Sequence, residues 1–173
     1  MFLKTFRLFI LLSLLQLPYK LQAQEFTQNF RALLSLYLEV GGNSDSYALN
    51  LDHILYQREQ WKGGVRAGLG TNIFFMKEEP GVYPVVPIEA YALLGKTRNH
   101  LEFGLGYTRR FTDDPDLLQN MYFGRVGFRY QVPKGGLLVR FGLTPFISPE
   151  GKDDKTGKVA VVPRFGFSIG RSW

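Results

Sequence analysis

The amino-acid sequence predicts an all-β protein, an eight-stranded antiparallel up-and-down transmembrane β-barrel. Three observations predict this fold class. After Leu38, apolar and polar residues alternate with a period of two, and no long 3.6-residue pattern follows. Clusters of Gly, Pro, Asn and Asp interrupt the alternation at hairpin spacing. The chain has no cysteine, so an exported protein of this size would need a packed interior or a membrane to stabilise it.

Residues 1–23 have the pattern of a secretory signal peptide. MFLKTFR supplies Lys4 and Arg7, an apolar run follows, and Ala23 precedes the expected cleavage point. The run is shorter than the roughly 20 residues of a membrane-spanning helix, and an uncleaved anchor is the alternative. Loss of the leader's three basic residues lowers the formal charge from +6 to +3, so nucleic-acid binding is not expected. Residues 24–33 are expected to form a short periplasmic segment, and residues 34–173 the barrel.

The eight strands are expected near 34–42, 46–56, 61–74, 83–94, 100–111, 120–132, 137–147 and 160–173. Each has one apolar face, which in membrane barrels contacts lipid. In chain order, these faces carry Leu36, Leu38 and Val40; Leu49, Leu51 and Leu55; Val65 and Leu69; Ile88 and Ala90; Leu101, Phe103 and Leu105; Tyr122 and Val126; Leu137, Phe141 and Leu143; and Phe165, Phe167, Ile169 and Trp173.

The opposite faces are polar and rich in glycine. Their charged members are Glu39, Asp52, Arg66, Glu89, Glu102, Arg125, Arg129 and Arg140. Eight strands enclose a lumen only wide enough for side chains, where large residues must alternate with small ones. Four acids and four arginines in such a space are expected to pair, giving a plugged interior with a salt-bridge network. Which acid meets which arginine cannot be read from the sequence.

The connections also have the asymmetry of a membrane barrel, with short periplasmic turns and longer outer loops. Turns are expected at Gln57–Gln60, Lys96–Asn99 and Pro133–Gly136. Outer loops are expected at Gly42–Asp45, Phe75–Val82, Thr112–Asn120 and Ser148–Lys158, of which only the first is short. The three long loops would present any surface that binds an extracellular ligand, whose identity the sequence does not indicate.

Segments such as HLEFGLGYTRRF, GGLLVRFGLTPF and the closing RFGFSIGRSW resemble the small bacterial outer-membrane β-barrels of the OmpA/OmpX type. The resemblance covers residues 34–173 and implies an outer-membrane location. In that family, alternating aromatic residues in the last strand are the signal read by the outer-membrane assembly machinery. Here Phe165, Phe167, Ile169 and Trp173 occupy the matching positions, with Trp in place of the commoner Phe at the terminus. The implied partners are outer-membrane lipids and this machinery, and a monomer is expected.

No catalytic, metal or cofactor site is expected. The only histidines are His53 and His100, and neither has a serine nearby that it could activate. Two alternatives to a structural or surface-interaction role remain open: a soluble periplasmic barrel with its apolar face turned inward around an apolar ligand, and an outer-membrane lipid A or phospholipid hydrolase. A conducting pore is a third. The aspartates of the 112–120 loop could hold Ca²⁺, although a solvated loop is favoured.

Overall fold

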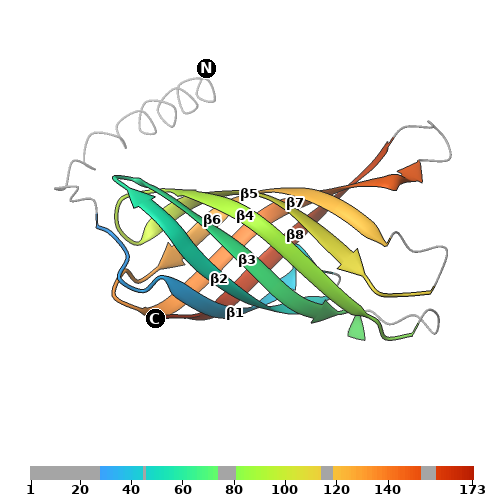
Figure 1. The fold of residues 1–173 in the computed structure, drawn as a ribbon, viewed down its shortest axis with the longest axis horizontal. Coiled ribbons are helices and arrows are strands. Elements are labelled where there is room, and N and C mark those ends of the chain that lie inside the picture. The colour runs from blue at the N-terminus through green and yellow to red at the C-terminus, as the bar shows by residue number, and fades with distance from the viewer. Residues whose placement is uncertain (1–27, 45, 74–80, 114–118, 153–158) are drawn as a thin grey trace, which may run out of the picture.

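The computed structural model describes residues 28–44, 46–73, 81–113, 119–152 and 159–173. These ranges contain eight strands, and none of them holds a helix long and apolar enough to cross a membrane. The predicted signal peptide lies outside the described residues. The strands are β1 (Leu34–Gly41), β2 (Tyr47–Arg58), β3 (Trp61–Thr71), β4 (Pro84–Leu94), β5 (Asn99–Arg110), β6 (Asn120–Gln131), β7 (Gly136–Lys152) and β8 (Val159–Ser172) (Figure 1).

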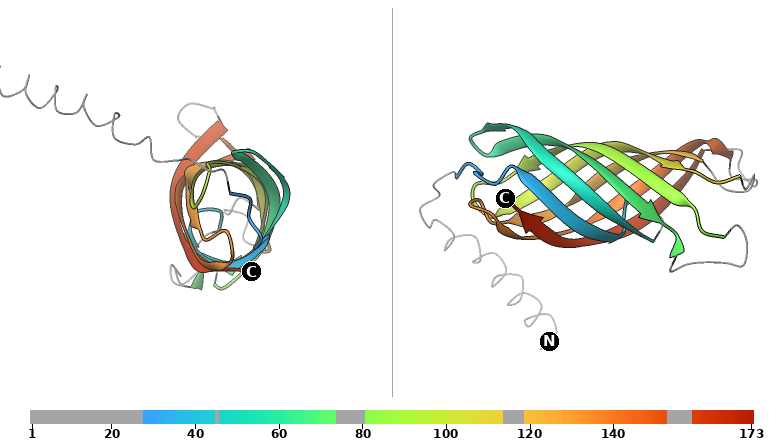
Figure 2. Two further views of the ribbon diagram at one scale, coloured as in Figure 1. Left: turned by 90° about the vertical axis from the view of Figure 1, so that its left-hand side faces the viewer. Right: turned by 60° about the horizontal axis from the view of Figure 1, so that its bottom comes forward.

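The strands form one closed antiparallel barrel in sequence order, which confirms the predicted all-β, up-and-down fold. Each strand pairs with its neighbours in the chain, and β1 closes the ring by pairing with β8 through contacts such as Leu38 opposite Ile169. The view along the axis in Figure 2 shows the closed wall. Closure satisfies the backbone hydrogen bonds of every strand and leaves no open sheet edge.

The two ends of the barrel differ. The end that carries the start of β1 and the carboxyl terminus, here called the terminal end, has the short β2–β3, β4–β5 and β6–β7 turns (Figure 1). The opposite end, here called the loop end, has the other four connections. Glu59 adopts a positive φ of 53° in the tight β2–β3 turn, the kind of left-handed conformation that such turns use.

The last hairpin is longer than the sequence indicated. An outer loop is expected at Ser148–Lys158, yet β7 continues to Lys152 and pairs there with Val159 of β8. The pairing shifts register between Ile147 and Lys152, which allows the hairpin to continue past Pro149 and Gly151. The expected loop Ser148–Lys158 was therefore wrong over its first five residues.

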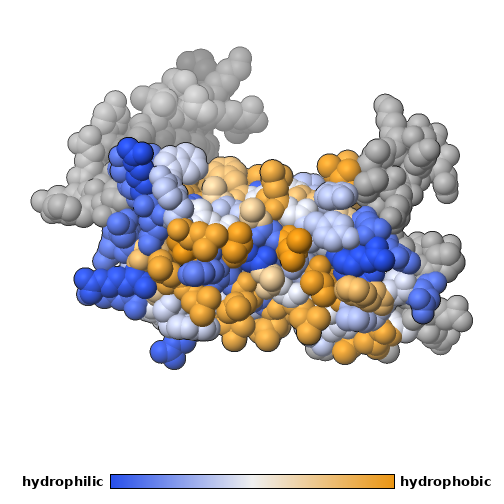
Figure 3. Space-filling view, viewed as in Figure 1, coloured by the Kyte–Doolittle hydropathy of each residue, from blue (hydrophilic) through white to orange (hydrophobic). Residues whose placement is uncertain are grey.

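The outer wall of the barrel is apolar and the inner wall is polar. Exposed and buried residues alternate along β2, for example, and the exposed ones include Leu49, Leu51 and Leu55. Among the described residues, the most exposed large apolar side chains are Phe165, at 79 %, and Leu105, at 76 %. Figure 3 shows apolar side chains spread over the wall between the ends, with hydrophilic residues at the terminal end. This arrangement is the reverse of a water-soluble β-barrel, whose apolar side chains face inward.

Candidate functional site

The candidate site is the lumen, where the barrel brings all eight predicted charged residues together. Each side chain points inward from a strand and is at most 2 % exposed. β1 to β5 supply Glu39, Asp52, Arg66, Glu89 and Glu102 in turn. β6 supplies Arg125 and Arg129, and β7 supplies Arg140.

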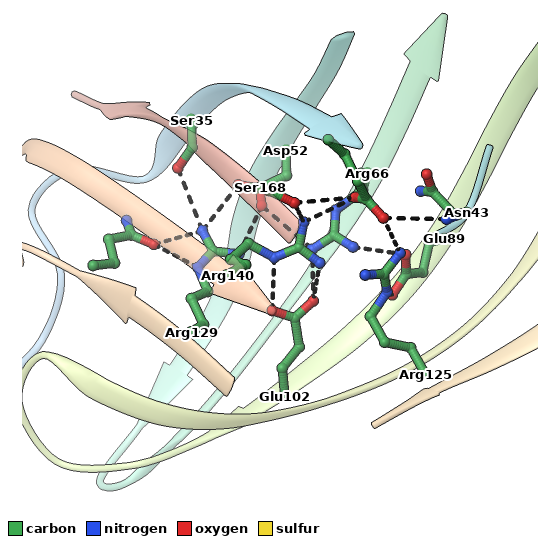
Figure 4. A network of polar contacts seen from close by, with 12 residues as sticks. Ser35, Asn43, Asp52, Arg66, Glu89, Glu102, Arg125, Arg129, Arg140 and Ser168 are labelled. Atoms are coloured by element: carbon green, nitrogen blue, oxygen red, sulfur yellow. Dashed lines mark hydrogen bonds and ion pairs between the residues drawn. The ribbon is translucent and has the colours of Figure 1, made fainter. Parts of the chain in front are cut away.

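Six of these residues form a closed ring in which acids and arginines alternate (Figure 4). Around the ring, the nitrogen–oxygen distances are Glu39–Arg125 2.8 Å, Arg125–Glu89 3.2 Å, Glu89–Arg66 2.6 Å, Arg66–Glu102 2.8 Å, Glu102–Arg140 2.6 Å and Arg140–Glu39 3.3 Å. Each member therefore meets two partners of opposite charge. Such mutual neutralisation, with charge-assisted hydrogen bonds, offsets the large cost of removing the charges from water.

Asp52 and Arg129 extend the ring toward the terminal end. Arg129 donates to both carboxylate oxygens of Asp52, at 2.6 and 3.2 Å, and to the amide oxygen of Gln131. Asp52 also lies 3.6 Å from Arg66, which links this pair to the ring. The extended network contains four acids and four arginines, so its formal charge is zero.

The eighth strand joins the network through a hydroxyl group. Ser168 of β8 donates to Glu39 Oε2, and its oxygen accepts from Arg140, both at 3.3 Å. Every strand of the barrel thus contributes a side chain to one connected set of polar contacts. Such a network crosslinks the wall from inside.

Two buried tyrosines lie against the arginines. The Arg140 and Arg66 guanidinium carbons lie 4.7 and 5.4 Å from the ring centre of Tyr37. Arg66 and Arg129 lie 4.9 and 5.3 Å from that of Tyr91. Both tyrosines are buried on the inner wall, but nothing in the sequence showed that they would pack on the guanidinium groups as cation–π partners.

Glycines of the polar face provide the space that these side chains occupy. A Cβ added at Gly104 would lie 2.0 Å from Glu89 Oε1, and one at Gly170 would lie 2.3 Å from Tyr37 Cβ. In this lumen, as expected for a narrow barrel, small residues therefore lie where the large inward-pointing side chains need space. Gly104 makes room for Glu89 of the ring, and Gly170 for Tyr37, which packs on Arg140.

The terminal end of the lumen is closed by residues 28–33, here called the terminal plug. Phe30 is buried at 3 % exposure and packs with Ile54, Tyr91 and Leu93. The Lys62 ammonium lies 5.2 Å from the centre of the Phe30 ring. The path of this segment across the barrel interior is visible in the axial view of Figure 2.

Hydrogen bonds fix the backbone of the terminal plug. The backbone N–H of Phe30 donates to the Gln57 side chain, whose amide group donates back to the Phe30 carbonyl. Gln131 donates to the Ala32 carbonyl at 3.1 Å. The sequence interpretation treated this stretch only as a segment preceding the barrel, because a single phenylalanine outside any periodic pattern carries no signal.

The loop end is closed by the described residues of the β1–β2 connection, residues 42–44 and 46, here called the loop plug. Its Asn43 N–H donates to Glu39 Oε1 at 3.1 Å, so it rests directly on the ion-pair ring. The Thr108 hydroxyl donates to the Asn43 carbonyl at 2.8 Å, and Arg164 donates to the Ser44 carbonyl at 2.9 Å. An apolar cluster of Met121, Phe123 and Phe146 fills space on the inner wall. The described part of the one short expected outer loop, residues 42–44, therefore folds into the lumen.

The remaining candidate residues are not part of this network. Phe165, Phe167 and Ile169 project from β8 to the outer wall and are exposed, and Trp173, which follows the strand directly, is exposed as well. His53 is also on the outer wall, whereas His100 is buried at the terminal end with its ring centre 5.0 Å from that of Phe30. Among the described residues, no three His, Cys, Asp or Glu side chains are grouped so that they could hold a metal ion. Asp114 and Asp116 of the considered calcium loop lie outside the described residues.

Comparisons with known proteins identify no relative of this chain. No family model matches the chain, and no curated protein or solved structure matches it. What the fold and the interior define is a class, the eight-stranded antiparallel β-barrel with a filled, charged lumen. The likeness to OmpA/OmpX-type proteins stays a prediction from sequence.

Proposed function

We propose that this chain is an integral outer-membrane β-barrel protein with a plugged polar lumen and a structural or surface-interaction role, without catalysis. The observation that carries the proposal is the apolar outer wall, which is continuous over strands whose inner faces are charged. Contiguous apolar surface of this extent is rare on monomeric proteins in water, whereas lipid covers it without penalty. A closed barrel also meets the requirement that every backbone polar group in a bilayer be satisfied internally.

The same observation disfavours the soluble alternative. A periplasmic carrier of apolar ligands would need an apolar cavity, but the described interior holds arginines, carboxylates and their hydrogen-bond partners. No arrangement of catalytic groups among the described residues favours the hydrolase alternative. A conducting pore is disfavoured because the ring and the two plugs occupy the lumen.

Gel mobility tests the membrane barrel most directly. Detergent-extracted protein is run with and without boiling, and we expect the unboiled sample to migrate differently because the barrel stays folded in detergent. Cell fractionation accompanies it, with the protein expected in the outer-membrane fraction. Recovery in the soluble periplasmic fraction, with no mobility shift, would refute the proposal.

The assembly signal is tested on the last strand. Deleting Trp173 should reduce the amount of folded, heat-shifted protein in the outer membrane, because the terminal aromatic residue belongs to the expected recognition set. Replacing the exposed Val161 by alanine is the control, since it leaves that set intact. Equal insertion of both variants would show that Trp173 is not needed for recognition by the assembly machinery.

Bilayer recordings test the plugged lumen. Purified protein at several hundred millivolts is expected to give no large, stable conductance. Stable channels in the unmodified protein would contradict the structural role and favour a pore.

A further inference from the structure

An apolar groove with a volume of about 800 Å³ crosses the outer wall from Leu34 of β1 to Tyr122 of β6. Its shallow middle is formed by Ala67 of β3 and Ala90 of β4. Val65 pairs with Ala90 and Ala67 pairs with Ile88, so the two alanines are diagonal neighbours on the same face. Leu105, opposite Ala90 on β5, forms a ridge beside them. The volume is within the range of about 300–1,000 Å³ typical of ligand sites.

One end of the groove is formed by two tyrosines with a cation beside them. The rings of Tyr107 and Tyr122 lie 5.3 Å apart, and both residues line the groove. The Tyr107 hydroxyl donates to Asn120 Oδ1, and Arg109 Nη1 donates to the same oxygen. The shared acceptor places the Arg109 guanidinium beside the phenol that ends the groove.

Arg109 differs from the arginines of the lumen in its partners. Each of the four arginines of the network contacts at least one carboxylate, whereas Arg109 donates to the neutral amide oxygens of Asn120 and Gln119. No ion pair with Arg109 occurs among the described residues. A guanidinium has five N–H donors, and the described residues accept from Nη1 and Nη2 of Arg109 without neutralising its charge, so an anion from outside the chain could use the remaining donors.

We propose that the groove and Arg109 bind one phosphate-bearing lipid, the lipid A anchor of lipopolysaccharide, in the leaflet at the loop end. One acyl chain lies in the groove over Ala67 and Ala90, and a phosphate contacts Arg109. The fork of an arginine matches the geometry of phosphate oxygens, and the apolar groove accepts a hydrocarbon chain. The inference rests on the proposed function, because only a barrel inserted in the outer membrane would present this wall to that leaflet.

The charge at the groove end decides between lipid A and other occupants. A second copy of the chain would meet the same apolar wall but would bring a second Arg109, which repels the first. An uncharged hydrocarbon would fill the groove without using the arginine. A phosphorylated lipid satisfies both features at once.

Native mass spectrometry of the folded protein in detergent, titrated with diphosphorylated lipid A, tests the site. Arg109→Gln keeps a hydrogen-bonding side chain but removes the charge, and binding should weaken about tenfold or more, as for loss of a charge-assisted contact. Ala90→Leu fills the groove and should weaken binding independently of the charge. Arg171→Gln and Val161→Leu, both exposed on β8, are the matched controls and should bind as the unmodified protein does.

A second probe, lipid A with its phosphates removed, should bind the unmodified protein and Arg109→Gln equally weakly. The site is refuted if Arg109→Gln and Ala90→Leu bind lipid A as their controls do, or if removal of the phosphates does not weaken binding. It is also refuted if the spectra show two copies of the chain bound to each other and no complex with lipid A. The gel-shift assay on the same samples separates the two proposals. Folded, heat-shifted variants with unchanged binding refute the lipid site alone, whereas absence of a shift in the unmodified protein refutes both proposals.

Discussion

The two ends of the lumen are both closed, but by different means. At the terminal end the closing element is a side chain, since Phe30 fills the space between Ile54, Tyr91 and Leu93. At the loop end it is the backbone, because the N–H and C=O groups of Asn43 hold the loop plug on Glu39 and Thr108. The Asn43 side chain is buried there and has no hydrogen-bond partner among the described residues. A side-chain plug depends on residue identity, whereas a backbone plug depends on conformation.

The largest effect is expected for Glu39→Gln, which acts at only one end. Glu39 accepts from Arg125, Arg140 and Asn43, so the change leaves two buried arginines short of a counter-charge. Breaking buried ion pairs in this way costs about 3–5 kcal/mol of unfolding free energy. Denaturant titration in detergent micelles measures it, and hydrogen exchange should accelerate at Asn43 but not at Phe30. Glu59→Gln, in an exposed turn, is the control. If Glu39→Gln accelerated hydrogen exchange equally at Asn43 and Phe30, the two ends would not be closed independently.

Phe30→Ala is expected to cost about 3 kcal/mol, as for other large aromatic residues removed from packed sites. The cavity would open the terminal end, and the contact of the ring with the Lys62 ammonium would be lost. The same titration measures the loss, and exchange should increase at residues 28–33. Phe111→Ala removes an exposed ring of equal size at the other end. A cost no greater than that of Phe111→Ala would show that the side chain does not close this end.

Gly42→Ala tests the backbone plug and should cost about 2 kcal/mol. Gly42 has a φ of +64°, and an added Cβ would lie 1.9 Å from Glu39 Oε1. Gly81→Ala is the matched control because Gly81 has a φ of +78° but no atom within 4 Å of an added Cβ. The difference between the two unfolding free energies isolates the clash with the ring from the cost of positive φ. No difference would mean that the loop plug moves away at little cost.

Asn43→Ala should have the smallest effect, at most about 0.5 kcal/mol in either direction. The change preserves the backbone contacts and removes two buried polar atoms that have no partner in the described part of the chain. Unfolding free energy again provides the measurement. A loss of about 2 kcal/mol or more would show that the side chain, and not the backbone, holds the loop plug, and the contrast between the ends would disappear.

Much of the fold could be predicted from short-range pattern. Period-two alternation located the eight strands and separated Leu49 and Leu51, which face outward, from Asn50 and Asp52, which face inward. The end of β7 was the exception, since Pro149 and Gly151 usually terminate strands and only pairing with β8 carried the hairpin beyond them. For the site, alternation identified the eight charged residues but gave neither their pairing nor the role of Tyr37, Tyr91 and Phe30.

The sequence by itself therefore determined the strands and the face on which each residue lies, because that information is local to each strand. Tertiary structure alone decided which side chains meet. Arg140 reaches Glu39 across 101 positions of sequence, and Gln131 reaches Ala32 across 99. These contacts depend on how far each strand is displaced along its neighbours when the barrel closes, and that displacement is a property of the whole ring.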